Sequence, residues 1–237
     1  MNTAEHPPQD ALTMLGILPW SGNLQGFDFP ESVETLVHYM TNEWLSDSHE
    51  DQMLTLLRQD ITLSSSHTLY EVENAYFGSL LRSAYASREH GEYEESRHFA
   101  RVRGVGQALA EGRRSAVAFI LNVNRNHWVA VIVDFCTSEI LWGDPLGHPP
   151  SAADIEALDW WTALHSGYTF AHRTLMVTRQ TDDFSCGLLA FGALAHYCLP
   201  EKYPLVAASE VADERLRMFL AIARRHLSEV SNLGNHA

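Results

Sequence analysis

The chain has 237 residues, 46% of them hydrophobic, and a formal net charge of −14 at pH 7. This length and hydrophobic content can build one sizeable core, whereas the negative charge argues against a general nucleic-acid-binding protein. No apolar run approaches the ~20 residues of a membrane-spanning helix, and the N-terminus lacks the basic and apolar regions of a signal peptide.

Residues 1–30 are rich in proline, glycine and polar groups, and we expect them to form an arm laid on the domain. Residues 31–237 are expected to form a single domain. Its first part, 31–113, is predicted to be mainly helical, with the clearest apolar face over residues 46–60. The helices predicted in this part cover residues 30–40, 46–60, 72–87 and 93–111.

In the second part, residues 114–200, the pattern changes to that of β-strands, which we expect to form a central sheet. A turn-forming Asn124-Arg125-Asn126 separates the first two strands, and the third ends at Gly143. The third part, 201–237, contains a long amphipathic helix. In chain order the predicted elements are strands at 119–123, 127–135 and 139–142, a helix at 154–166, a strand at 169–178, an apolar helix at 186–199 and the amphipathic helix at 209–231.

Cys186 follows a polar, turn-forming segment and begins a strongly apolar stretch, so we expect it in the first turn of a buried helix. Unpaired backbone N–H groups and the positive end of the helix dipole favour a thiolate there. Gly187 would leave room for a substrate backbone, and the Gln180 amide could donate a hydrogen bond to an oxyanion. The alternative is a buried cysteine without a chemical role, because free cysteine is often buried.

His127 opens the second predicted strand and Asp144 follows the third, so both would lie at the same end of neighbouring antiparallel strands. There a carboxylate can hold one nitrogen of an imidazole while the other nitrogen faces a thiol. Together with Cys186 and Gln180, these residues predict a site for nucleophilic catalysis. His148 is a poorer candidate for the base, because it lies in a loop and not on a strand.

The remaining cysteines and histidines do not indicate a metal site. Cys136 and Cys198 have no partner histidine in a suitable local context, because Cys136 lies beside a hairpin turn and Cys198 ends the apolar helix, and a structural role is favoured for both. The 13 histidines lack the spacing typical of metal ligands, so we expect no metal and no cofactor. Three cysteines without disulfide spacing fit a reducing compartment, and we therefore expect an intracellular protein of the cytoplasm or nucleus.

In this order and spacing, these residues resemble the ubiquitin-like proteases: the SUMO-specific proteases, their deneddylase relatives and, more distantly, the adenovirus protease. The resemblance rests on His127-Trp128 at a strand start, on Asp144 downstream, and on Gln180 six residues before Cys186-Gly187. The segment Trp44-Leu45-Ser46-Asp47 is similar to the family's Trp-Leu-Asn-Asp segment near the start of the domain. There are two departures, which leave the modifier specificity open. Serine stands at position 185, where the family usually has aspartate, and at position 46, where it has asparagine.

The resemblance implies an α+β fold of the papain-like cysteine protease type, with a central, mostly antiparallel sheet flanked by helices. It implies that His127 is the base and that Asp144 orients it. It also implies that Trp128 and Trp44 line a narrow tunnel for the tail of the substrate, which Asp47 would contact as well. For Trp128 the alternative is a core residue that packs beside its neighbours on the strand.

The function implied by the resemblance is that of a protease or isopeptidase that cleaves after the C-terminal Gly-Gly of a ubiquitin-like modifier. A SUMO-type modifier is favoured, and a deubiquitinase or deneddylase with the same chemistry is the alternative. Two further alternatives are a non-hydrolytic module that binds a modifier and an acetyltransferase relative, although the sequence has no phosphate-binding signal for coenzyme A. We expect the modifier and its conjugates as partners, neither nucleic acid nor membrane, and a monomeric enzyme.

Overall fold

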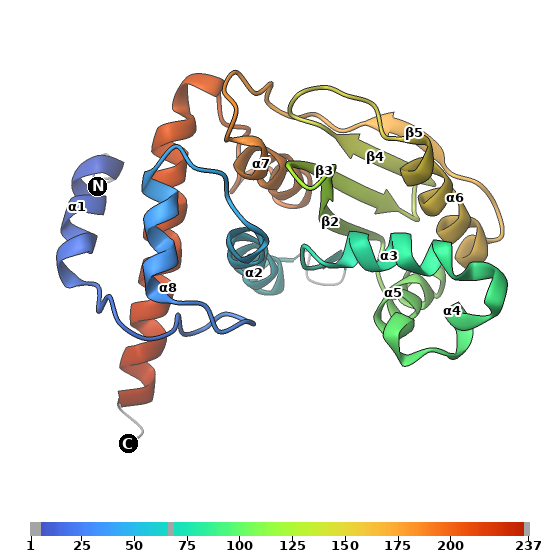
Figure 1. Ribbon diagram of the computed structural model, residues 1–237, viewed down its shortest axis with the longest axis horizontal. Helices are drawn as coiled ribbons and strands as arrows, with labels where there is room; N and C mark the ends of the chain where they lie inside the picture. Colours follow the sequence, from blue (N-terminus) through green and yellow to red (C-terminus); the bar gives the residue numbers. More distant parts are fainter. Residues whose placement is uncertain (1–5, 66–68, 235–237) are drawn as a thin grey trace.

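A five-stranded sheet lies at the centre of the computed structural model, which describes residues 6–65 and 69–234. The strands follow one another in the order β1-β2-β3-β4-β5, so neighbours in the sheet are also neighbours in the sequence (Figure 1). The central strands β2, β3 and β4 are antiparallel, whereas β1 and β5 run parallel to their neighbours. The α+β fold class is confirmed, with a mixed sheet whose antiparallel part is its centre. The strands are β1 (Tyr70–Val72), β2 (Ala116–Val123), β3 (His127–Asp134), β4 (Glu139–Gly143) and β5 (Ala171–Thr174).

Helices cover both faces of the sheet, and the sheet divides the core into two clusters (Figure 1). Side chains along β3 alternate between them: Trp128 and Ala130 belong to the first cluster, Val129 and Val131 to the second. The first cluster includes residues of α1 (Pro7–Ile17), η1 (Val33–Met40), α2 (Asp47–Leu63), α7 (Cys186–Cys198) and α8 (Val211–Gly234). The second includes residues of α3 (Phe77–Ala86), α4 (Glu92–Glu95), η3 (Arg97–Phe99), α5 (Ala100–Ala110) and α6 (Ala152–Ser166). The remaining short 3-10 helices are η2 (Arg88–His90) and η4 (Ala208–Glu210). Within the described ranges, none of the helices has both the length and the apolar character needed to cross a bilayer.

The N-terminal region contains a helix, α1, that the composition of this region does not predict. Pro7 stands in its first turn, where a missing N–H is tolerated. Ala11 and Met14 are buried, and the helix packs against α8. The division of the chain into an arm, 1–30, and a catalytic domain stays a prediction.

Two predicted helices differ from the structure in the helical part of the chain. The first is the helix predicted over residues 72–87. Strand β1 occupies its expected start, and helix α3 begins only at Phe77. Three residues are too few to show the alternation that indicates a strand. The second is interrupted near Ser96, whose side chain accepts the N–H of His98 at 3.1 Å, so that α4 and α5 are separate helices.

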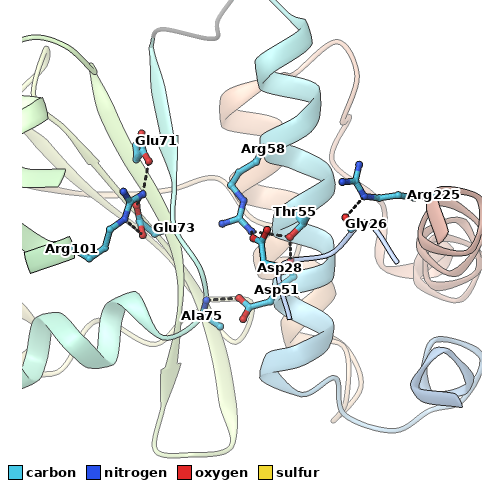
Figure 2. A network of polar contacts seen from close by, with 10 residues as sticks. All are labelled: Gly26, Asp28, Asp51, Thr55, Arg58, Glu71, Glu73, Ala75, Arg101 and Arg225. Carbon is cyan, nitrogen blue, oxygen red and sulfur yellow. Dashed lines mark hydrogen bonds and ion pairs between the residues drawn. The ribbon is translucent and has the colours of Figure 1, made fainter. Parts of the chain in front are cut away.

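Polar contacts hold helix α2, which begins directly after Trp44-Leu45-Ser46. Asp51 accepts the backbone N–H of Ala75 at 2.7 Å and so ties the helix to the segment between β1 and α3 (Figure 2). Further along the helix, Arg58 forms an ion pair with Asp28 at 2.7 Å (Figure 2). The helix is therefore fixed both to the edge of the sheet and to the N-terminal region.

Candidate active site

Helix α7 begins at Cys186, as the sequence predicts, and this cysteine is buried. The loop before it is organised by Asp182, whose Oδ1 accepts the backbone N–H groups of Phe184 at 3.0 Å and of Ser185 at 2.8 Å. The Ser185 hydroxyl donates to the other carboxylate oxygen. Asp182 thus places a carboxylate beside Ser185, the position at which the resembled family usually has an aspartate.

The structure brings His127 and Asp144 together at one edge of the sheet. The distance between His127 Nε2 and Asp144 Oδ1 is 2.8 Å, and both side chains are buried. Asp144 follows the last residue of β4, and its Oδ1 also accepts the N–H of Leu146 at 2.6 Å and that of Gly147 at 3.2 Å. These bonds fix the carboxylate, which in turn fixes the orientation of the imidazole.

The β2–β3 hairpin sets the position of His127. In its turn, Asn124 and Arg125 have φ values of 55° and 64°, the left-handed conformation that type I′ hairpin turns need at both central residues. With this turn, Val123 pairs with His127 and the imidazole stands at the first residue of β3. A one-residue change of register would carry it to the other face of the sheet.

The surroundings of His127 favour its charged form. Burial alone would lower its pKa, but hydrogen bonds with Asp144 and Cys186, and the charges of these groups, raise it to about 9. Burial would raise the pKa of Asp144, but its bonds with His127 and the Leu146 N–H outweigh burial and lower the pKa. The geometry therefore supports an imidazolium between a carboxylate and the cysteine.

Gln180 lies in the same cleft as Cys186. Its backbone N–H donates to the carbonyl of Pro145 at 2.9 Å, which ties it to the loop after Asp144. Its side-chain Nε2 donates to the carbonyl of Asp182 at 3.0 Å and to the Asp182 Oδ1 at 3.3 Å. The amide is thus held near the cysteine, with its hydrogens engaged by Asp182.

Two hollows meet at Cys186, and Trp44 lines both of them. Trp44 is 53% exposed, and its Nε1 donates to the carbonyl of Asp183 in the loop before the cysteine. Trp128 is only 7% exposed and donates from Nε1 to the carbonyl of Leu45 at 2.9 Å. Asp47 lines the hollow that contains Trp128. The two tryptophans therefore differ: one covers the cleft and the other lies mostly in the core beneath it.

The space beside Gly187 is filled by a side chain and is not open to a substrate, contrary to the expectation from the sequence. A Cβ at Gly187 would collide with the Glu50 carboxylate and would lie 3.3 Å from Cδ1 of Trp128. Glu50 is completely buried, and neither of its carboxylate oxygens has a hydrogen-bond partner among the described residues. Burial, followed by the charges of Cys186 and Asp51, raises the pKa of Glu50 well above its ordinary value.

The sequence contains a signal for Glu50 that motif analysis misses. On helix α2, Glu50 precedes Met53, Leu54 and Leu57 by three, four and seven residues, so it belongs to the apolar face. An acidic residue on such a face is unusual and marks a candidate for a special role. Asp182 is missed for another reason, because nothing in the sequence distinguishes it from the neighbouring Asp183.

The remaining candidates lie away from these groups or contribute little to them. His148 is exposed, with its Nδ1 3.7 Å from the Asp144 Oδ2. Burial raises the pKa of Cys198 to about 12, whereas Cys136 is exposed. Within residues 6–65 and 69–234, no three His, Cys, Asp or Glu side chains are grouped as metal ligands would be.

A scan against protein-family models finds no match for this sequence, and a search of curated proteins finds none either. Solved structures with a similar fold do exist. The SUMO protease Ulp1 with its catalytic cysteine oxidised to a sulfenic acid is 17% identical, with a TM-score of 0.69 over 93% of this chain and 96% of that one. The Ulp1-like SUMO protease catalytic domain of Chaetomium thermophilum is 11% identical, with a TM-score of 0.61 over 94% and 90% of the two chains. The Xanthomonas campestris effector XopD bound to ubiquitin is 18% identical, with a TM-score of 0.50 over 75% and 91%. The chain therefore has the fold of the Ulp1 proteases, and the resemblance to the ubiquitin-like proteases is confirmed at the level of the fold.

The contact between Gly187 and Glu50 predicts the effect of a single added methyl group. We expect Gly187→Ala to lower the free energy of unfolding by about 1–3 kcal/mol, the usual range for overpacking a core. The matched control is Gly192→Ala on the same helix, where a Cβ would meet nothing within 4 Å. In chemical denaturation, the double variant Gly187→Ala with Glu50→Ala should lose less stability than the sum of the two single changes. Strict additivity would show that Glu50 is not the obstacle.

The His127–Asp144 pair predicts a pH-dependent stability. Because the folded state raises the pKa of His127 from 6.5 to about 9, the stabilisation is complete below pH 6.5 and is lost as the pH rises through 9. Asp144→Asn should therefore lower the free energy of unfolding most near pH 6 and least above pH 9. Denaturation curves across this range would measure the effect, with His98→Gln, at an exposed position of η3, as a control that should leave the profile unchanged. An Asp144→Asn effect that is constant with pH would contradict the charged pair.

Proposed function

We propose that this chain is a cysteine protease or isopeptidase that cleaves after the C-terminal Gly-Gly of a ubiquitin-like modifier, with a SUMO-type modifier favoured. The observation that carries the proposal is the imidazole of His127, which bonds with Asp144 at 2.8 Å and lines the same cleft as Cys186, the first residue of a buried helix. This arrangement occurs in a chain with the fold of the SUMO protease Ulp1. Three free cysteines fit a reducing compartment, the cytoplasm or the nucleus.

The proposed reaction proceeds through a covalent acyl-enzyme. The Cys186 thiolate attacks the carbonyl carbon of the terminal glycine and forms a C–S bond. As the C–N bond then breaks, the His127 imidazolium gives its proton to the leaving amine, and a thioester remains. His127 next takes a proton from water, which attacks the thioester and releases the modifier carboxylate and Cys186. In both steps Asp144 keeps the imidazole oriented.

The tetrahedral oxyanion needs hydrogen-bond donors, and two groups are suited to this role. The backbone N–H of Cys186 is unpaired within the first turn of α7, and the Gln180 amide lies in the same cleft. One such donor typically contributes ~3–4 kcal/mol to the stabilisation of the transition state. Since the Gln180 hydrogens are engaged by Asp182, we propose that one of them is released to the oxyanion when substrate binds.

The cleft beside Cys186 fits a substrate tail without side chains. The exposed ring of Trp44 lies over the loop that leads to the cysteine, and Trp128 and Asp47 line the hollow on one side. We propose that a Gly-Gly tail passes between these walls, where bulkier residues would be excluded by steric clash. The negative charge of −14 suits a modifier that presents a basic face.

Ubiquitin is the second candidate for the modifier. One observation favours it: XopD, whose structure was determined bound to ubiquitin, shares the fold over 75% of this chain. The chemistry at Cys186 would be the same for both modifiers, because the scissile bond follows glycine in either case. Only the surface away from the cysteine would distinguish them.

The catalytic proposal predicts that Cys186→Ala abolishes cleavage of SUMO or ubiquitin carrying a C-terminal fluorophore. The fold should persist, since the change removes only a sulfur atom. Cys136→Ala is the matched control and should cleave at the wild-type rate. Comparison of the two fluorogenic substrates would identify the modifier, with faster cleavage of SUMO expected. Cleavage by the Cys186→Ala variant would overturn the assignment of the nucleophile, and binding of a modifier without cleavage by the wild type would favour a non-hydrolytic module.

The different burial of the two tryptophans predicts different consequences of their removal. We expect Trp128→Ala to lower the free energy of unfolding by ~3–5 kcal/mol, as for other core aromatic residues. Trp44→Ala should melt within a few degrees of the wild type but lose most cleavage of Gly-Gly-ended substrates, because the exposed ring covers the cleft. Thermal melting and steady-state kinetics of both variants would test this. Full activity of Trp44→Ala would exclude Trp44 from the substrate site.

A further inference from the structure

Arg215 lies on the C-terminal helix α8 and is only 3% exposed. Its Nε donates to the carbonyl of Tyr39 at 3.3 Å, and its Nη2 donates to the carbonyl of Glu43 at 3.0 Å and to that of His38. These carbonyls lie at the end of η1, which runs beside α8 (Figure 1), and in the connection that leads into Trp44. Arg215 therefore fixes the backbone that carries Trp44 to the cleft.

The same guanidinium group also contacts the loop before Cys186, in which Asp182 and Asp183 line the cleft. Its carbon Cζ lies 5.6 Å from the centre of the Phe184 ring, within the range of a cation–π interaction. Phe184 stands two residues before Cys186, in the loop that Asp182 organises. A single side chain from α8 thus touches both the segment before Trp44 and the loop before the cysteine.

The segment that carries Trp44 and the loop before Cys186 also contact each other directly. Trp44 Nε1 donates to the carbonyl of Asp183, although the tryptophan itself is 53% exposed. An exposed ring has few packing contacts of its own, so its position depends on the backbone at both ends of this hydrogen bond. Arg215 holds the backbone at one end through carbonyls and contacts the loop at the other end through Phe184.

This arrangement uses properties that are specific to arginine. A planar guanidinium presents five N–H donors in a fixed fork, whereas lysine has a compact ammonium group on a flexible stem. Burial of a charge is costly, and an apolar side chain of similar volume often gives equal or greater stability. The Nη1 of Arg215 has no hydrogen-bond partner in the described part of the chain, which adds to this cost. A buried arginine that binds backbone carbonyls and the Phe184 ring therefore points to a role beyond packing.

We propose that Arg215 is a positioning residue of the substrate cleft, which holds the Trp44 ring at a set distance from Cys186. The kinetic consequence rests on the proposed function, because a Gly-Gly tail would need a cleft of fixed width between this ring and the cysteine. The structural consequence does not depend on it. Loss of Arg215 would loosen the Trp44–Asp183 hydrogen bond in any case.

The test uses Arg215→Lys, with Arg224→Lys, at an exposed position of the same helix, as the matched control. We expect hydrogen exchange of the Trp44 indole N–H, followed by NMR, to become roughly tenfold faster in Arg215→Lys, which corresponds to the loss of a hydrogen bond to a charged group. KM for a Gly-Gly-ended fluorogenic modifier should rise roughly tenfold, while kcat and the alkylation rate of Cys186 change by less than about threefold. The control should show none of these changes.

A second variant keeps the proposal testable if Arg215→Lys does not fold. Phe184→Leu removes the ring from the guanidinium and leaves the carbonyl contacts of Arg215, and it should raise indole exchange and KM in the same direction. Where both variants fold, their effects should not add in the double variant, because they interrupt the same connection. Unchanged indole exchange and unchanged KM in a folded Arg215→Lys or Phe184→Leu variant would overturn the proposal. If the wild type cleaves no modifier, the proposed function fails and the indole exchange alone decides the role of Arg215.

Discussion

The burial of helix α7 against strand β3 and helix α2 is the constraint on which the candidate site depends. Alanines at positions 190, 193 and 195 are almost completely buried and allow the helix to approach its neighbours closely. A helix held in this way cannot shift or rotate without disturbing the core. Its first residue, Cys186, is therefore fixed relative to the start of β3, where His127 stands. The cysteine and the imidazole come together because the core positions the elements that carry them.

Several polar groups lie around this helix start, and two of them, Glu50 and Arg215, are buried. Glu50 lies against Gly187, Asp182 organises the loop before Cys186, and Arg215 contacts the ring of Phe184. Burial of such groups is costly unless hydrogen bonds compensate it. Oxygens of Glu50 and a nitrogen of Arg215 lack partners among the described residues, so compensation is incomplete here. Incomplete compensation around a reactive group is typical of functional sites, where stability is exchanged for a required arrangement.

Predictions from the sequence were most accurate where one short pattern determines both the type of an element and the residue at which it begins. The change from a polar turn to an apolar run at Cys186 predicts the first residue of α7, and Asn124-Arg125 predicts the hairpin that sets His127. Strand β1 was not predicted because three residues show no period, and helix α1 was not predicted because residues 1–30 are rich in proline, glycine and polar groups, which is typical of irregular structure. The chemical roles of His127, Asp144 and Cys186 remain proposals that their geometry supports.

The resemblance to the ubiquitin-like proteases implied the α+β fold class, and the sequence pattern by itself determined the apolar helix that begins at Cys186 and the strand ends that carry His127 and Asp144. These features follow from local periodicity and turn chemistry, which act over a few residues. Only the tertiary structure decided that Glu50 fills the space beside Gly187 and that Arg215, on the last helix, holds the backbone before Trp44. Such contacts join segments far apart in the chain, and no local pattern encodes them, because they arise from the packing of α2 against the cysteine helix and of α8 against η1.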